Sequence, residues 1–246
     1  DPPPPKKSWA VAALVASINH KSDPVVDILP NHKNIDVRLP IGSIAKTMTA
    51  FHVFEAMEEG RLKPDDYIPI TPDMFCLPSN KFSAESLPPG INRIRVDEGL
   101  AHMLRTSNNT IAEAFARFLG NSPEAFVTKM NGLATKWGAK NTNFVTPHGL
   151  PPQNRSSEYT TARDFAVIAA HLVKHDEKFM KYESYPLTVD GVYYLPEGTT
   201  YKQRFIEAGV RLKTASTAAC YSFVAWVQLQ EKFQFAAKFC EPNAKL

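Results

Sequence analysis

Strand-like apolar segments lie at both ends of this 246-residue chain, and helical patterns fill the middle. Residues 9–18 and 25–29 are apolar and flank a polar stretch rich in turn residues, which favours a hairpin. Residues 221–229 are apolar on both faces, and residues 233–239 alternate between apolar and wetter positions, which predicts two further strands. Because strands need partners, the chain predicts one antiparallel sheet completed by both termini.

Five helices are predicted between these ends, over residues 43–59, 97–104, 110–119, 122–137 and 161–172. Gly60 ends the first of them. Asp97 is expected to cap the second, and Ser122 to cap the fourth, with proline at the next position. Thr161 and Asp164 resemble a capping box at the start of the last helix. These helices should cover the faces of the sheet or form a lobe of their own.

The composition excludes several functional classes. Apolar residues make up 43% and charged residues 22%, as in an ordinary globular protein, and the net charge is only +3 with no basic block that would bind nucleic acid. No stretch of 18 apolar residues occurs, so no transmembrane segment is expected in this chain. The three cysteines, Cys76, Cys220 and Cys240, are odd in number and lack metal-ligand spacing, so they predict no disulfide framework or zinc site and leave their pairing open.

The N-terminal segment has the character of an extended leader. Residues 1–8 start without methionine, contain four consecutive prolines and lack an apolar signal core. An exported protein begins in this way after its signal peptide has been removed, and a trimmed chain would look the same.

Ser43 and Lys46 form the first candidate chemical motif. A serine hydroxyl is a poor nucleophile unless a base lies beside it. Residues three apart at a helix start share one face, so Lys46 can reach the Ser43 hydroxyl. Taken alone, the same pattern also fits a capping serine followed by a surface lysine.

Two further triplets have weak signals individually. Ser107-Asn108-Asn109 lies between two predicted helices, where it could equally cap the second helix. Lys213-Thr214-Ala215 ends a short apolar run before residue 221, where it could equally be an ordinary strand end. Helix start, inter-helix loop and strand end, in this order, are the contexts of the SxxK, SxN and KTG motifs of penicillin-recognising enzymes.

With these three motifs in order, the chain resembles the D-alanyl-D-alanine carboxypeptidases of peptidase family S11, the low-molecular-mass penicillin-binding proteins. Residues 39–50, LPIGSIAKTMTA, are similar to the family's P-A-S-x-T-K-x-M-T-A. Residues 143–150, NFVTPHGL, are similar to N-F-x-N-x-H-G-L, and residues 161–164 match S/T-A-R-D. The resemblance covers about residues 9–240, which is nearly the whole chain.

The resemblance implies an α+β fold of the serine β-lactamase and DD-peptidase group. Its antiparallel sheet would have about five strands flanked by helices, with a helical lobe at about residues 60–170. Residues 9–246 would form the catalytic domain after the leader of residues 1–8. The C-terminal β domain and membrane anchor of many relatives are expected to be absent.

Three catalytic roles are implied by the resemblance. Ser43 would attack the carbonyl between two D-alanines and form an acyl-enzyme, and Lys46 would be its general base. Ser107 would pass a proton to the leaving amine. His148 is expected to fix its loop, because a lysine-based mechanism leaves a histidine base no role.

The resemblance also assigns substrate contacts. Asn109 would bind the substrate amide, while Lys213 and Thr214 would attract and contact its terminal carboxylate. The oxyanion hole would use the backbone N–H groups of Ser43 and Ser216. Ala215 stands where the family has glycine and Ser216 where it has histidine, and the methyl group at position 215 takes up room beside the substrate.

The function implied is that of a serine-type D-Ala-D-Ala carboxypeptidase acting on peptidoglycan stem pentapeptides in the periplasm or cell envelope. It would be bound covalently by β-lactams and would need no metal or organic cofactor. Ala215 and the missing C-terminal elements motivate one alternative, a catalytically impaired homologue that binds peptidoglycan or a partner. A β-lactamase is disfavoured, because neither Glu158 nor any other glutamate before Lys213 lies in an E-x-x-L-N segment.

Overall fold

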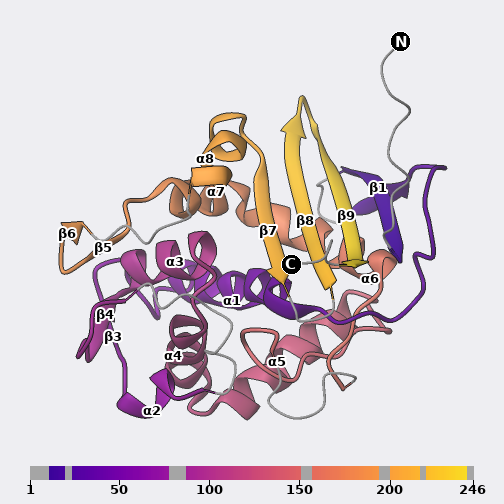
Figure 1. Cartoon of the computed structure of the whole chain (residues 1–246). Coiled ribbons are helices and arrows are strands. Elements are labelled where there is room, and N and C mark those ends of the chain that lie inside the picture. Colours follow the sequence, from indigo (N-terminus) through magenta and orange to yellow (C-terminus); the bar gives the residue numbers. More distant parts are fainter. Residues whose placement is uncertain are drawn as a thin grey trace.

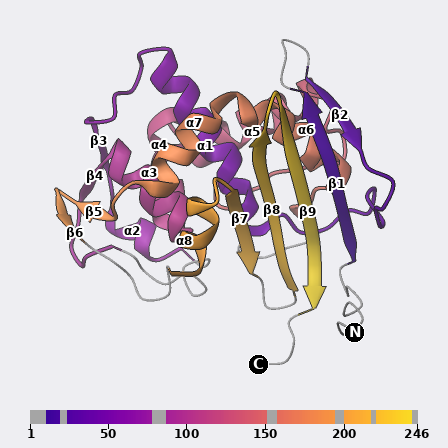
Figure 2. The same ribbon diagram turned by 90° about the horizontal axis from the view of Figure 1, so that it is seen from above.

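Both ends of the chain contribute to a five-stranded antiparallel sheet, as predicted. The computed structural model describes residues 11–19, 24–77, 87–150, 157–193, 200–216 and 220–242 (Figure 1). The strands lie in the order β2-β1-β9-β8-β7 (Figure 2). Their bounds are Ala12–Asn19 for β1, Val25–Ile28 for β2, Arg211–Ser216 for β7, Cys220–Leu229 for β8 and Lys232–Pro242 for β9. The two predicted hairpins, β1 with β2 and β8 with β9, are therefore confirmed.

Helices fill the segment between the strands. The main ones are α1 (Lys46–Glu58), α3 (Val96–Arg105), α4 (Asn109–Gly120), α5 (Pro123–Lys136), α6 (Ala162–Leu172), α7 (Asp176–Ser184) and α8 (Thr200–Glu207). A 3₁₀ turn, η1 (Gly42–Ala45), leads into α1. The sequence analysis did not predict α7, α8 or the short elements α2 (Pro72–Phe75), β3 (Tyr67–Pro69), β4 (Arg93–Arg95), β5 (Thr188–Val189), β6 (Val192–Tyr193) and η4 (Val173–His175).

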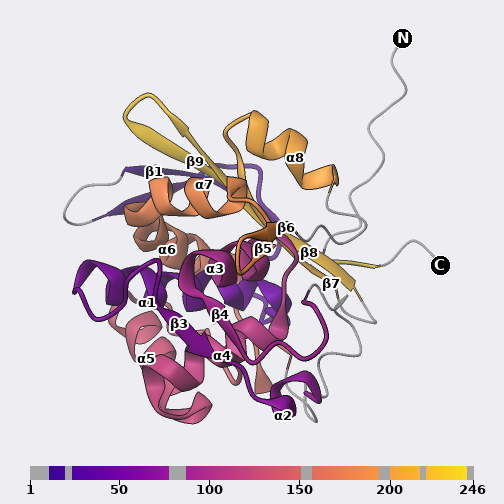
Figure 3. The same cartoon turned by 90° about the vertical axis from the view of Figure 1, so that its left-hand side faces the viewer.

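The sheet buries one set of alternating side chains against the helices. In β9 the residues Phe233, Phe235, Ala237 and Phe239 are buried, whereas the residues between them are half-exposed. β1 shows the same alternation from Ala12 to Ile18. Seen from the side, α1, α3, α4 and α5 lie on one side of the sheet (Figure 3). α6 packs against β1 and β9. This two-layer arrangement gives each amphipathic element one apolar face to bury.

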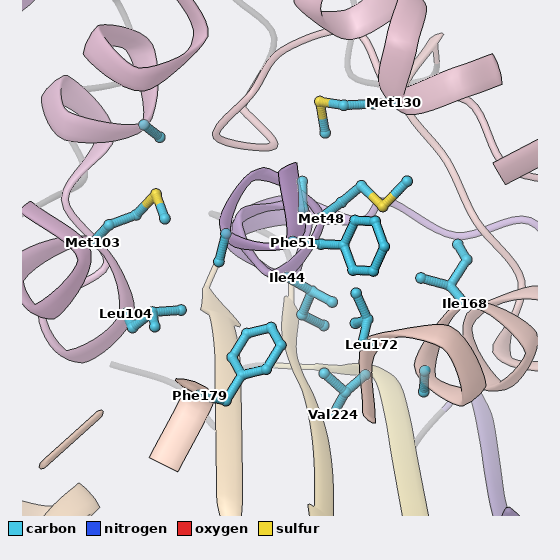
Figure 4. Close-up of a cluster of buried hydrophobic side chains, with 14 of the residues drawn as sticks. Ile44, Met48, Phe51, Met103, Leu104, Met130, Ile168, Leu172, Phe179 and Val224 are labelled. Atoms are coloured by element: carbon cyan, nitrogen blue, oxygen red, sulfur yellow. The ribbon is translucent and has the colours of Figure 1, made fainter. Parts of the chain in front are cut away.

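Helix α1 is the centre of the core, because it is buried on almost all sides. Figure 4 shows Met48 and Phe51 of α1 surrounded by side chains from the other layers. These neighbours include Met103 and Leu104 from α3, Ile168 and Leu172 from α6, Phe179 from α7 and Val224 from β8. A helix held in this way gives its N-terminal turn a fixed position.

Most predicted helix starts are confirmed, with one correction. Ser122 accepts a hydrogen bond from Ala125 N, and Thr161 accepts one from Asp164 N. Asp97 does not cap its helix: α3 begins at Val96, and the carboxylate instead pairs with Arg95 at 2.7 Å and accepts from the next amide, Glu98 N. Arg95 binds the carboxylate oxygens that would otherwise accept from the first amides of the helix. The apolar pattern of a helix gives no sign of such a partner.

The structure gives partial information on the cysteines, on membrane-spanning segments and on the domain division. Cys240 is disulfide-bonded, and Cys76 is free and exposed. No helix in the described ranges has the length and apolar character needed to cross a membrane. The leader of residues 1–8 lies outside the described residues. The division into a catalytic domain at 9–246 with a helical lobe at about 60–170 stays a prediction.

Candidate active site

The turn before α1 brings Ser43 and Lys46 together. Gly42 enters the 3₁₀ turn with a φ of 57°, and Lys46 is the first residue of α1. Residues three apart eclipse each other in a 3₁₀ turn, so the two side chains lie one above the other. Lys46 Nζ donates to Ser43 Oγ at 2.9 Å. Ser43 is 9% exposed and Lys46 is fully buried, so the serine is at the edge of solvent and the lysine lies behind it.

A backbone carbonyl provides the second acceptor for Lys46. Lys46 Nζ donates to His148 O at 3.0 Å, in the loop that precedes residue 150. A buried ammonium group is costly unless it has partners, and these two acceptors supply them in part. They also aim Nζ at the serine oxygen, because a bond on either side of the nitrogen restricts the lysine rotamer.

The loop between α3 and α4 carries the second serine. Ser107 has a φ of 62°, in the left-handed region that non-glycine residues rarely adopt. Asn108 follows as the cap of α4, because its side chain accepts from Ile111 N at 2.9 Å. Asn109 is then the first residue of α4 and is buried. The alternative interpretation of this triplet, a helix cap, is therefore correct for Asn108, while Ser107 is directed elsewhere.

Strand β7 brings a second lysine to this loop. Lys213 Nζ donates to Ser107 Oγ at 2.8 Å, although the residues are 106 positions apart. Arg211, Lys213 and Ala215 share the inward face of β7 and are buried. Thr214 is half-buried, and Ser216 at the end of the strand is exposed.

The two serine–lysine pairs belong to one region of the molecule. β7 packs against η1, the turn that carries Ser43. The bond between Lys213 and Ser107 joins the same strand to the loop before α4. The structure thus gathers the SxxK-like, SxN-like and KTG-like motifs from three separate segments around one edge of the sheet. This arrangement can deliver a serine nucleophile, its base and a second hydroxyl to one substrate.

Comparison with known proteins gives the family. The sequence profile of peptidase family S11, described as D-alanyl-D-alanine carboxypeptidase, matches residues 17–231. The chain belongs to peptidase family S11. The resemblance seen in the sequence motifs is therefore confirmed over most of the chain.

Named S11 relatives are similar but longer. The D-alanyl-D-alanine carboxypeptidase DacA of Escherichia coli strain K12 is 31% identical over 164 residues, which are 65% of this chain and 40% of that protein. DacF of Bacillus subtilis strain 168 is 33% identical over 157 residues, which are 63% of this chain and 39% of that protein. The chain thus spans about 40% of the length of the curated relatives that it matches.

Solved structures confirm the fold. Penicillin-binding protein D2 from Listeria monocytogenes, in its ampicillin-bound form, has a TM-score of 0.76 at 25% identity and covers 98% of this chain and 93% of its own. A DD-transpeptidase from Streptomyces K15 has a TM-score of 0.75 at 22% identity, with 97% of this chain and 93% of its own covered. The expected α+β fold of the DD-peptidase group is therefore correct.

The S11-like loop at residues 143–150 lies directly against η1, the turn that carries Ser43. Gly149 has a φ of 84°, and a Cβ added there would lie 1.7 Å from the carbonyl oxygen of Gly42. Thr146 Oγ1 accepts from Gly149 N at 2.9 Å, and Thr49 of α1 donates to Pro147 O at 2.6 Å. Only glycine permits this close approach, so the loop and the turn have one relative position.

His148 fixes this loop, in line with the expectation from sequence. Its Nδ1 accepts from Leu150 N at 3.2 Å, and the ring is buried. Burial first, and the charge of Lys46 second, lower the pKa of His148 to about 3. The imidazole is therefore neutral near pH 7, and its backbone carbonyl, rather than its ring, serves Lys46.

Ala215, the departure from the family's glycine, turns its methyl group inward. It is 3% exposed and belongs to the same apolar cluster as Ile44 and Val224. β7 packs against η1, so this buried methyl group belongs to the strand that meets the turn carrying Ser43.

Glu158 is a neighbour of the site that the sequence analysis set aside. It is buried and accepts from Val145 N. Burial raises its pKa to about 8, while hydrogen bonds from Val145 and Thr146 and then the charge of Lys46 oppose the rise. No local pattern marks this residue, because its environment is created by the packing of the 143–150 loop against α1.

One group of described side chains has the spacing of metal ligands. Glu55, Glu58 and His175 bring their oxygen and nitrogen atoms close together at the far end of α1. Lys174 Nζ lies 2.7 Å from Glu55 Oε1, and Lys178 Nζ lies 2.5 Å from Glu58 Oε1. The lysine ammonium groups neutralise the carboxylates, so we interpret the group as an ion-pair network that joins α1 to α7.

Proposed function

We propose that this S11 chain is a serine-type D-Ala-D-Ala carboxypeptidase that removes the terminal D-alanine from peptidoglycan stem pentapeptides. The observation that carries the proposal is the pair of contacts Lys46–Ser43 at 2.9 Å and Lys213–Ser107 at 2.8 Å, on segments that pack together. Membership of a family described as D-alanyl-D-alanine carboxypeptidase supports the substrate class.

Acylation would begin at Ser43. The neutral amine of Lys46 takes the hydroxyl proton as Oγ attacks the carbonyl carbon between the two D-alanines. The resulting oxyanion accepts hydrogen bonds from the backbone N–H groups of Ser43 and Ser216. The C–N bond then breaks, and the leaving amine of D-alanine receives a proton through Ser107. The products are free D-alanine and an ester on Ser43, which water hydrolyses with Lys46 again accepting a proton.

Substrate binding would use the edge strand. An extended peptide lies along β7 in the manner of an added strand. Its terminal carboxylate meets Lys213 and the Thr214 hydroxyl, and Asn109 binds the substrate amide. The backbone at Ala215 and Ser216 lines the same wall. This mechanism uses no metal or organic cofactor.

β-Lactam antibiotics would be covalent inhibitors of the same serine. Their strained amide presents a carbonyl to Ser43, and the leaving amine stays tethered after the ring opens. The ampicillin-bound form of the Listeria penicillin-binding protein supports this proposal. The peptidoglycan substrate further implies an exported protein of the periplasm or cell envelope, with a role in cell wall biogenesis and cell shape.

Release of D-alanine tests the proposed activity. Wild-type protein is incubated with a pentapeptide that ends in D-Ala-D-Ala, and free D-alanine is measured with an oxidase assay. The wild-type protein should release one D-alanine per peptide, and Ser43→Ala should release none. No release by folded wild-type protein would contradict the proposal.

A second candidate function rests on Ala215. Its methyl group is buried, and its strand β7 packs against η1; these two elements carry the amides of the proposed oxyanion hole, which must be spaced correctly. If these two amides were too far apart, the protein would bind peptidoglycan peptides without hydrolysing them. Peptide binding without D-alanine release, in a protein that penicillin does not acylate, would favour this impaired homologue.

A further inference from the structure

A buried carboxyl group lies behind the serine–lysine pair. Glu158 is 1% exposed, so it does not face solvent. Its Oε1 accepts from Val145 N at 3.3 Å, and within the described part of the chain Oε2 makes no hydrogen bond of good geometry, although the amide and hydroxyl of Thr146 lie near the carboxyl. A buried carboxyl with such incomplete hydrogen bonding is costly, which makes it a residue that the fold alone does not explain.

The loop at residues 145–150 connects Glu158 to the catalytic lysine. Glu158 holds the amide of Val145, and three residues later the carbonyl of His148 accepts from Lys46 Nζ at 3.0 Å. Thr49 anchors the loop between these points through Pro147 O. Glu158 and Lys46 therefore bind the same short loop, so a change at Glu158 that moves Val145 can also move the His148 carbonyl.

Charge couples the same two residues. The ammonium of Lys46 stabilises the ionised form of Glu158, against a burial effect that is larger. This attraction is mutual, so an ionised Glu158 also stabilises the protonated form of Lys46. His148, which lies beside Lys46, stays neutral because burial and the charge of Lys46 lower its pKa to about 3, and Lys213 faces the site from β7 with Ser107 as its acceptor.

We propose that Glu158 is a positioning residue for Lys46: its carboxyl fixes the loop that binds the lysine, and its negative charge, when present, keeps the proton on the lysine. The proposal rests on the proposed function, in which a neutral Lys46 accepts the Ser43 proton. Glu158 itself is too deeply buried to reach a substrate or a hydrolytic water. It therefore acts only through Lys46.

The coupling has a definite sign. Below pH 8 most of the Glu158 carboxyl is protonated and leaves Lys46 free to lose its proton. Above pH 8 the carboxylate forms, holds the proton on Lys46 and opposes the rise of the acylation rate with pH. Glu158→Gln removes the charge at every pH and keeps an oxygen for Val145 N.

The experiment is the pH profile of acylation by a fluorescent penicillin, measured for wild-type protein and for Glu158→Gln. We expect the rising limb of the variant to shift by about one pH unit to lower pH, which is up to about tenfold in rate at the steepest point. Superimposable profiles would overturn the proposal. A variant that acylates normally but fails only in deacylation would also overturn it, because that result assigns Glu158 to the hydrolytic step.

Glu98→Gln is the matched control. Glu98 is also a buried glutamate that accepts backbone amides, from Asp190 and Gly191, but it lies on α3. Its replacement should leave the pH profile of acylation unchanged. An equal shift in this control would overturn the proposal, since it would show a general response to lost carboxylates.

Thermal melts give a readout that does not depend on activity. A carboxyl whose pKa is about 8 when folded and about 4.3 when unfolded makes the folded state less stable as pH rises between these values. The difference in melting temperature, Glu158→Gln minus wild type, should therefore increase as pH rises through this range. A difference that stays constant with pH would overturn the proposal. If penicillin acylates no variant, the proposed function fails, and melts of Lys46→Ala still decide the coupling. If Glu158→Gln does not fold, Lys46→Ala should extend the stability loss of the parent above pH 8, and an unchanged curve would overturn the coupling.

Discussion

Lys46 shows how much a single buried side chain depends on its partners. Its amino group is completely enclosed and donates both to Ser43 Oγ and to the carbonyl of His148. The serine contact is the path by which a proton can leave the hydroxyl, and the carbonyl contact holds the nitrogen on that path. The residue is thus placed for general base catalysis by two bonds from different parts of the chain.

Replacing Lys46 tests this role. Lys46→Ala should slow acylation by penicillin roughly 10²- to 10⁴-fold, the usual contribution of a positioned base. The measurement is the second-order rate with a fluorescent penicillin, together with circular dichroism to show that the variant is folded. Lys136→Ala, at an exposed position on α5, should acylate at the parental rate. Parental acylation by folded Lys46→Ala would remove Lys46 from the mechanism.

Replacing Ala215 should increase the acylation rate, whereas replacing Lys46 should decrease it. Ala215→Gly should raise the acylation rate, because loss of the buried methyl group lets β7, with the proposed oxyanion-hole amide of Ser216, move closer to η1. A displacement near 1 Å at the reacting carbonyl is worth on the order of 10²-fold in rate. The cost is about 0.5–1 kcal/mol of stability from backbone entropy. Ala237→Gly, at an equally buried position in β9, should lose stability without gaining rate, and an unchanged or slower rate for Ala215→Gly would show that the alanine is harmless.

At the scale of elements, the site depends on the contact between the loop at 143–150 and the turn η1. Gly149 and Gly42 meet there, and both have positive φ values. The loop supplies the carbonyl for Lys46, and the turn supplies Ser43. The spacing between these two short segments therefore sets the geometry of the serine–lysine pair.

Gly149→Ala tests this contact. An added Cβ would overlap the Gly42 carbonyl, and the left-handed backbone adds strain of about 1–3 kcal/mol, so the variant should be clearly less stable and should acylate more slowly. Thermal melts and acylation rates check both expectations. Gly132→Ala is the control, because a Cβ there meets nothing within 4 Å and should stabilise α5 by up to about 1 kcal/mol. Equal behaviour of the two variants would contradict the account.

At the scale of the whole molecule, a buried ion pair joins the sheet to the helices. Arg211 of β7 is bonded to Asp176 of α7, and Trp226 Nε1 of β8 donates to the other carboxylate oxygen at 2.8 Å. Asp176→Asn leaves the arginine without its charged partner and should cost roughly 3–5 kcal/mol. For a chain of this size, the melting temperature should fall by at least roughly 6 °C. A fall of under 2 °C would show that the pair contributes little.

Much of the fold could be predicted from the sequence, because its signals are local. An apolar run beside turn residues marked β1, apolar residues on both faces marked β8, and alternation marked β9. Serine or threonine before an apolar period marked the starts of α5 and α6. The helices α7 and α8 were missed because both are short segments in which polar and charged residues outnumber the apolar ones. The wrong prediction that Asp97 caps α3 has another origin. Its competing partner Arg95 is placed by the pairing of β3 with β4, which no local pattern shows.

The residues of the candidate site could be predicted from the sequence, but the contacts that position them could not. Ser43, Ser107 and Lys213 lie in motifs whose order along the chain is informative. The bond between Ser107 and Lys213, the carbonyl of His148 and the buried carboxyl of Glu158 depend on contacts between residues far apart in sequence. Such contacts exist only once the sheet and helices have packed.

The most direct test of the account is the mass of the intact protein after incubation with a penicillin, followed by peptide mapping. The account predicts a mass increase equal to one penicillin molecule, located on the peptide that contains Ser43, and no increase for Ser43→Ala. An adduct on another residue, or no adduct on folded wild-type protein, would contradict the assignment of Ser43 as the nucleophile.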